Sequence, residues 1–175
     1  MKSSQSSSTR KAVQIVVAAG VALGSASAAA AEQIFLQIEG VPGESQDKAH
    51  KDWIDIQAFS SGTGPKQCPQ FNFQKRIDKA TPKLMEGAFI QRRLGKSTLS
   101  LMRTGEVPYE AMKIVFEGTI AEYQSMNSCD YCDSGYESFS ILMSSAAVSY
   151  KPQLPDGSLG AEVKATLNCA TLGVK

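Results

Sequence analysis

Four cysteines are the residues of this 175-residue chain whose spacing most directly suggests chemistry. Cys129 and Cys132 stand close together in "SCDYCDSG", whereas Cys68 and Cys169 lie far apart in the chain. A zinc site would want a second close pair. A redox-active C-x-x-C motif wants surroundings that favour the thiolate, and the aspartates of this motif oppose it. In an oxidising compartment the four cysteines are most simply two disulfides, with three possible connectivities.

The single histidine is the other residue that could do chemistry. His50 lies in "DKAHKDW", with no G-x-S-x-G motif or paired-carboxylate signature around it. A lone histidine in such a setting is more often hydrogen-bonded for structure, or solvated, than a general base. We therefore expect no catalytic residue, no cofactor and no metal site. A hydrolase that uses His50 and a nearby carboxylate remains an alternative.

The N-terminus predicts export from the cytoplasm. Residues 1–31 run from a basic start through the apolar stretch 12–23 to several small residues, which is the order of a secretory signal peptide. The apolar stretch is shorter than the roughly 20 residues that span a bilayer. We expect cleavage between Ala31 and Glu32, which leaves one domain, 32–175, in the periplasm or outside the cell. Sec and twin-arginine export are not distinguished.

The charge of the expected mature chain excludes some partners. Residues 1–31 hold three of the 18 basic residues and none of the 17 acidic ones, so the remainder has a formal charge of −2. Such a balance favours neither nucleic acid nor an anionic membrane surface. We expect no nucleic-acid partner and no membrane span in the mature chain.

Alternating apolar and polar residues predict a mainly β fold. A long segment, 111–125, contains Gly118, which indicates a bulge or bend. The segment 135–153 reads as its hairpin partner, joined to it by the loop with the close cysteine pair. The expected strands are 33–39, 53–60, 71–77, 97–103, 111–125, 135–153 and 161–169.

One helix start interrupts the strands. In "RIDKATPKLMEG", Thr81 can cap the first turn and Pro82 can occupy the first helical position. We expect a helix over about 82–94, which Gly87 weakens and which therefore needs tertiary packing. It would cover a sheet face with one apolar side, made of Leu84, Met85, Ala88 and Phe89.

Several motifs together resemble the Hcp (haemolysin-coregulated protein) family of type VI secretion. They are "GESQDKAHKDW", "DKATPKL" and a long hairpin that ends in "SYKPQLPDGS", and the resemblance covers nearly all of residues 34–175. It implies a two-sheet β-barrel with one flanking helix, assembled into six-membered rings that stack into a tube. The implied partners are copies of the chain itself, type VI secretion components and small effector cargo. An exported barrel that binds a protein or a ligand is the alternative.

The resemblance also assigns a stacking loop to residues 60–72, and Cys68 falls within it. If Cys129 and Cys132 bridge locally, Cys68 pairs with Cys169 and ties this loop to the last strand. Pairing of Cys68 with either residue of the close pair stays open. The candidate stacking residues are Ser61, Gly62, Gly64, Pro65, Gln67 and Gln70.

Overall fold

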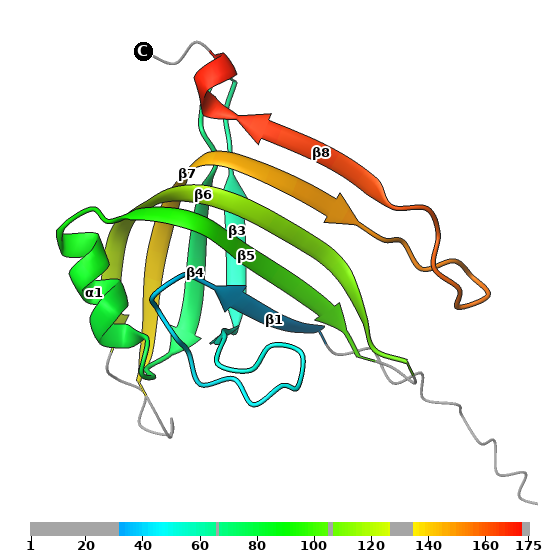
Figure 1. The fold of residues 1–175 in the computed structure, drawn as a ribbon, viewed down its shortest axis with the longest axis horizontal. Helices are drawn as coiled ribbons and strands as arrows, with labels where there is room; N and C mark the ends of the chain where they lie inside the picture. Colours follow the sequence, from blue (N-terminus) through cyan, green and yellow to red (C-terminus); the bar gives the residue numbers. More distant parts are fainter. Residues whose placement is uncertain (1–31, 66, 105–106, 127–134, 173–175) are drawn as a thin grey trace, which may run out of the picture.

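The computed structural model describes residues 32–65, 67–104, 107–126 and 135–172 (Figure 1). These described residues form eight strands, one α-helix and a short 3-10 helix, η1. The loop with Cys129 and Cys132 lies outside the described residues. The elements are β1 (Glu32–Gln37), β2 (Ile54–Ile56), β3 (Ala58–Gly62), β4 (Gln70–Arg76), α1 (Thr81–Phe89), β5 (Arg93–Arg103), β6 (Tyr109–Met126), β7 (Tyr136–Tyr150), β8 (Val163–Asn168) and η1 (Cys169–Leu172).

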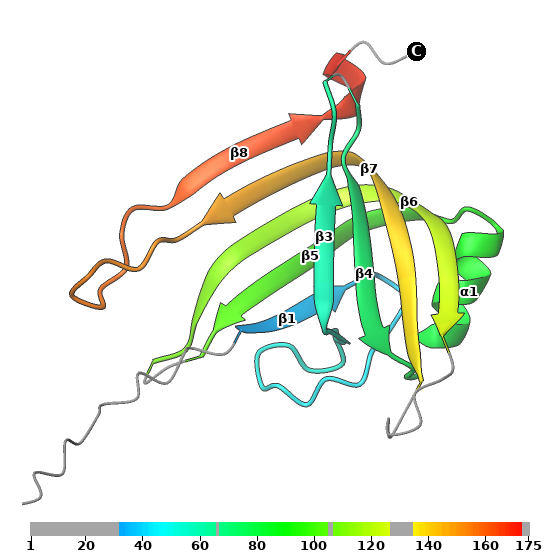
Figure 2. The same ribbon diagram turned by 180° about the vertical axis from the view of Figure 1, so that it is seen from behind.

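All eight strands belong to one curled antiparallel sheet, in the order β2-β1-β5-β6-β7-β4-β3, with β8 also on β7. Along one edge of β7, residues 136–142 pair with β4 and residues 145–150 pair with β8. The sheet therefore forks, and its two branches form the two layers of an open half-barrel (Figures 1 and 2). The expected mainly β fold with one flanking helix is confirmed.

The expected strand at 53–60 is wrong as a single element. The chain makes β2, leaves the ladder at Gln57 and starts β3, because β2 pairs with β1 whereas β3 pairs with β4. The two short strands thus lie at opposite ends of the strand order. The strand expected at 97–103 is longer than predicted and begins at Arg93.

Gly118 produces the bend that closes the curl. The register between β6 and β7 shifts at Glu117/Gly118, as expected for a bulge. A Cβ atom at residue 118 would lie 2.5 Å from the carbonyl oxygen of Leu142, so only glycine lets the strands approach this closely. The apolar core fills the inside of the curl, where the rings of Phe73 and Phe139 stack at 5.1 Å.

Helix α1 is shorter than expected, and only Leu84 and Ala88 of its predicted apolar side face the core. It ends at Phe89, since Gln91 takes a left-handed φ of 48° just before β5. The helix packs on β6 through Leu84 and Gly87; a Cβ on Gly87 would lie 2.7 Å from Ile120 Cδ1. The predicted apolar side is wrong at two positions, because Met85 is 50% and Phe89 is 90% exposed. No helix in the described residues is long and apolar enough to span a membrane.

Thr81 is not the helix cap that the sequence predicted. The cap residue is Ala80, with no capping bond from its side chain, and Pro82 does lie in the first turn. The Thr81 hydroxyl donates to Glu137 Oε1 at 3.0 Å and accepts from the Asp78 N–H at 3.0 Å. The Thr81 hydroxyl therefore bonds to the buried Glu137 and not to the first turn of the helix. The Asp78 carboxylate instead accepts the Ala80 N–H at 2.8 Å.

A fully buried ion pair joins the helix start to the sheet. Lys75 and Glu137 each have 0% side-chain exposure, and Lys75 Nζ lies 2.7 Å from Glu137 Oε1. The ammonium also donates to Asp78 Oδ1 and to the carbonyl of Arg76, each at 2.7 Å. Glu137 Oε2 accepts from the Tyr123 hydroxyl at 2.7 Å. All three ammonium donors and both carboxylate oxygens are thus satisfied, which is the condition for tolerating buried charge.

We predict that Tyr123→Phe lowers the free energy of unfolding by about 1.5–3 kcal/mol at neutral pH, because a hydrogen bond to a charged buried group is lost. Burial, with the bond to Glu137, raises the pKa of Tyr123 from 10.0 to about 12. Between these values the unfolded chain loses the phenolic proton while the folded one keeps it, so the contribution of Tyr123 to stability is complete below pH 10 and disappears towards pH 12.

Denaturant unfolding at pH 7 and at several values between pH 10 and 12 measures both effects. The wild type should lose stability over this range more steeply than Tyr123→Phe. The control is Tyr150→Phe, which changes a side chain that is already 37% exposed. Equal stability of the two variants at pH 7 would contradict the role of Tyr123.

Candidate functional site

Strand β8 is the most incomplete part of the described structure. It pairs with β7 from Val163↔Tyr150 to Asn168↔Ser145, and its other edge has no strand partner among the described residues. All six of its side chains are exposed. In this monomer, β8 contributes no buried side chain to the core.

One face of β8 is apolar and continues the core-facing layer of the sheet. Directly paired residues of antiparallel strands lie on the same face. Phe116 and Ala146 are buried, but Leu167 at the end of the same row is 41% exposed, and Val163 at the end of a neighbouring row is 62% exposed. An apolar layer thus runs past the core onto an uncovered strand. The rows are Met112–Tyr150–Val163, Ile114–Val148–Ala165 and Phe116–Ala146–Leu167.

A disulfide between Cys68 and Cys169 closes the point where the sheet forks. β8 ends opposite Ser145, and β4 begins opposite Leu142. The bond therefore links Cys169, which follows the end of β8, to Cys68, which lies just before β4, and both strands pair with the same edge of β7. This is the long-range pairing preferred in the sequence analysis. With both sulfurs in a disulfide, neither is a thiolate ligand for zinc.

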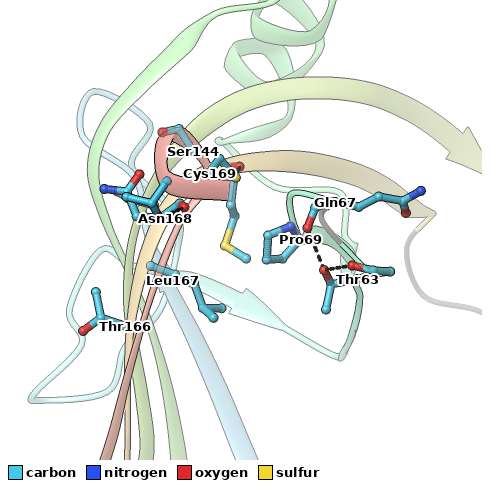
Figure 3. A pocket seen from close by; sticks show the side chains of 13 residues that line it. Thr63, Gln67, Pro69, Ser144, Thr166, Leu167, Asn168 and Cys169 are labelled. Carbon is cyan, nitrogen blue, oxygen red and sulfur yellow. Dashed lines mark hydrogen bonds between the residues drawn. The ribbon is translucent and has the colours of Figure 1, made fainter. Parts of the chain in front are cut away.

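A hollow of about 230 Å³ lies beside this disulfide, between the β3–β4 connection and β8 (Figure 3). Thr63 closes one side, and its hydroxyl donates to the carbonyl of Gln67 at 2.8 Å. Leu167, Asn168 and Cys169 line the other side. No side chain of the described lining carries a charge. The hollow therefore offers apolar and neutral polar contacts but no general acid or base.

The structure gathers the six predicted stacking residues at one end of the sheet, near η1 (Figure 2). Ser61 and Gly62 end β3, and Gln70 begins β4. Between them lie Gly64, Pro65 and Gln67, none of which is buried. Their role in stacking stays a prediction.

His50 lies inside the protein, away from β8. It is 6% exposed, its ring stacks on Phe35 at a centroid distance of 4.3 Å, and Trp53 packs edge-on at 4.8 Å. Its Nδ1 lies 2.7 Å from Asp47 Oδ1, and its Nε2 lies 3.1 Å from Ser100 Oγ. The bond to His50, with backbone N–H groups of Ala49 and His50, lowers the pKa of Asp47.

The order Asp47–His50–Ser100 is that of a nucleophilic triad, but its setting favours a structural role. Ser100 is 0% exposed, so its oxygen faces no substrate. Its hydroxyl donates to Glu110 Oε1 at 2.7 Å. These bonds fasten the segment between β1 and β2 to β5 and β6.

The sequence showed the alternation in β8 but not its exposure. Val163, Ala165 and Leu167 alternate with polar residues, which is the usual pattern of a strand that covers a core. Whether anything covers that face depends on segments distant in the chain. The exposed apolar face of β8 is therefore the candidate interaction surface that sequence reasoning missed.

Comparison with known proteins gives one family. The family model described as "Type VI secretion system effector, Hcp" matches residues 35–150, well over half of the chain. Protein hcp1 of Pseudomonas aeruginosa is 27% identical over 143 residues, which is 73% of this chain and 88% of that protein.

Solved structures show the same fold. Hcp1 from Salmonella typhimurium superposes with a TM-score of 0.73 at 24% identity, covering 81% of this chain and 96% of that one. A structure described as a type six secretion system protein has a TM-score of 0.74 at 20% identity, covering 81% and 98%. A type VI secretion system effector from Yersinia pestis has a TM-score of 0.64 at 21% identity, covering 77% and 98%.

We predict that replacing both Cys68 and Cys169 by serine lowers the free energy of unfolding by about 4–5 kcal/mol. The bond joins residues 101 positions apart, and the chain-entropy model assigns about 4.7 kcal/mol to a loop of roughly 100 residues. Denaturant unfolding of the oxidised wild type and of the variant measures the difference. A loss below about 1 kcal/mol would show that the unfolded chain gains little freedom when the link is absent.

Proposed function

Since this chain belongs to the Hcp family of type VI secretion system effectors, we propose that it is a structural subunit that assembles with copies of itself into rings. The family resemblance implies rings of six that stack into a hollow tube. The proposal extends both features to this chain, with type VI secretion components and small effector cargo as further partners.

The observation that carries the proposal is the exposed apolar face and unpaired edge of β8. An open edge presents free backbone N–H and C=O groups that a neighbouring strand can satisfy. A subunit docked there would also cover Val163, Ala165 and Leu167, which the monomer leaves in water. Assembly would thus cover the apolar face of β8 and supply a partner for its open edge.

A closed ring of identical chains needs two different surfaces on each subunit. β8 supplies one of them. The edges of β2 and β3 that have no strand partner among the described residues, at the two ends of the strand order, are the candidates for the other. The β3–β4 connection would then face along the ring axis, where the stacking residues Ser61 to Gln70 can contact the next ring.

We also propose that residues 1–31 direct export and are removed, leaving domain 32–175 outside the cytoplasm. The Cys68–Cys169 disulfide supports this location, because disulfides persist in oxidising compartments and are rare in the cytosol. Export through a cleaved leader is a departure from tube subunits that leave through the secretion machine itself.

We predict that Leu167→Asp prevents ring formation while the subunit stays folded. The charge would enter an apolar contact between subunits, whereas in the monomer this side chain is already 41% exposed. Native mass measurement of the oxidised mature protein should give the mass of a ring for the wild type and that of one chain for the variant.

The matched control is Thr166→Asp, which places the same charge on the opposite, polar face of β8 and should keep the ring. A wild type that stays a single chain at high concentration would defeat the ring. It would favour the alternative, an exported barrel that binds a protein or ligand.

We predict that the mature protein begins at or near Glu32 and is recovered from the periplasm or the medium. The basic, apolar and small-residue order of residues 1–31 is the reason. N-terminal sequencing of the native protein measures it. An intact Met1 on protein recovered from the cytoplasm would overturn the export proposal.

A further inference from the structure

We propose that the Cys68–Cys169 disulfide is a redox latch for β8: when the bond is reduced, residues 163–168 leave the edge of β7. The latch is a property of the single chain. Only its consequence for rings, given below, rests on the proposed function.

The non-covalent hold on β8 is confined to one neighbour. Its backbone pairs with β7 through six residues, and none of its side chains is buried. Elements held by few buried apolar contacts and by solvent-exposed hydrogen bonds belong to the low-stability end of a fold. The disulfide is thus the covalent tie between β8 and the β3–β4 side of the sheet.

The contact beside the disulfide is loosely filled. The hollow of about 230 Å³ separates Thr63 and Gln67 from Leu167 and Asn168 (Figure 3). Packed side chains therefore do little to join the β3–β4 connection to β8. Once the bond is cut, this corner retains little that would keep the two segments together.

Of the two strands that meet at the latch, β8 is the one free to move. β4 is paired on both sides, with β3 and β7, and it buries Phe71, Phe73 and Lys75. β8 has one strand partner and no buried side chain. Opening the latch should therefore release β8 and leave β4 in place.

The segment between β7 and β8 can act as the hinge. Residues 151–162 hold their own turns, with the Leu154 N–H on the Ser158 carbonyl and the Gly160 N–H on the Pro152 carbonyl, each at 2.8 Å. These bonds are internal to the segment, so they survive when β8 leaves β7. In Figure 1 the segment projects beyond the end of the sheet, where it has room to turn.

The chemistry of the latch is thiol–disulfide exchange. To close it, one cysteine thiolate attacks a disulfide-bearing oxidant and forms a mixed disulfide with it. The second cysteine thiolate then displaces the oxidant, which leaves as a dithiol carrying two electrons and two protons. A dithiol reductant reverses both steps and returns two cysteine thiols.

The consequence for assembly follows if β8 forms the ring contact. A chain whose latch is open lacks a fixed β8 edge and therefore stays unassembled. The latch would close in the oxidising compartment that export reaches, so that rings form only after the chain has left the cytoplasm.

Amide hydrogen exchange, read by mass spectrometry on the mature protein, tests the latch. The oxidised wild type is compared with the wild type reduced by a dithiol and alkylated, and with Cys68→Ser/Cys169→Ser. In both latch-open samples residues 163–168 should exchange at least about tenfold faster, because they open locally. Residues 70–76 should keep their protection, which also shows that the fold persists.

Cys129→Ser/Cys132→Ser is the matched control, because it removes the other two cysteines and keeps the latch. Oxidised, it should show the slow exchange of the oxidised wild type at 163–168. Equal exchange of residues 163–168 in the oxidised and reduced wild type would overturn the latch. The reduced wild type supplies the comparison if the serine variant does not fold.

The native mass of the same samples separates this proposal from the ring. If the oxidised protein is a single chain and residues 163–168 exchange faster after reduction, the result supports the latch and overturns the ring. A ring that survives reduction with residues 163–168 still protected overturns the latch and leaves the ring standing.

Discussion

The buried ion pair between Lys75 and Glu137 is the constraint on which the rest of this structure depends. Lys75 points inward because it shares the inner face of β4 with Phe71 and Phe73. A shift of one residue in the register of β4 would turn all three outward, so the charge and the aromatic core specify the same register. Since the network also takes in Asp78, Thr81 and Tyr123, it places the start of α1 against the sheet.

The opposite end of the sheet is built in the reverse way. Around Lys75 all three ammonium donors and both carboxylate oxygens of Glu137 have partners, whereas β8 leaves apolar side chains in water and has one edge without a strand partner among the described residues. Proteins usually protect such edges, because an uncovered strand invites pairing with another chain. An edge attached by backbone pairing and one disulfide suits a subunit whose missing neighbour is another copy of itself.

The buried polar groups in the described part of the chain hold elements of the fold together. Asp47, His50 and Ser100 have the order of a catalytic triad, yet His50 and Ser100 are buried and the three residues connect a loop to the sheet. The hollow beside the disulfide has no charged lining. The assembly proposed for this member of the Hcp family therefore rests on the exposed face and open edge of β8.

Local sequence was enough to predict the features that depend on neighbouring residues: the alternation that makes strands, the bend at Gly118 and the helix start near Pro82. It did not determine which faces are covered, because that depends on segments distant in the chain. Met85 and Phe89 have the spacing of a buried side but face solvent, since Leu84 and Gly87 fit closer to β6. Thr81 has the pattern of a cap, but the buried carboxylate of Glu137 binds its hydroxyl. Val163 and Leu167 have the pattern of a core strand, but the tertiary structure leaves them exposed. β8 and β4 pair with different parts of the same edge of β7, and no described segment buries the side chains of β8.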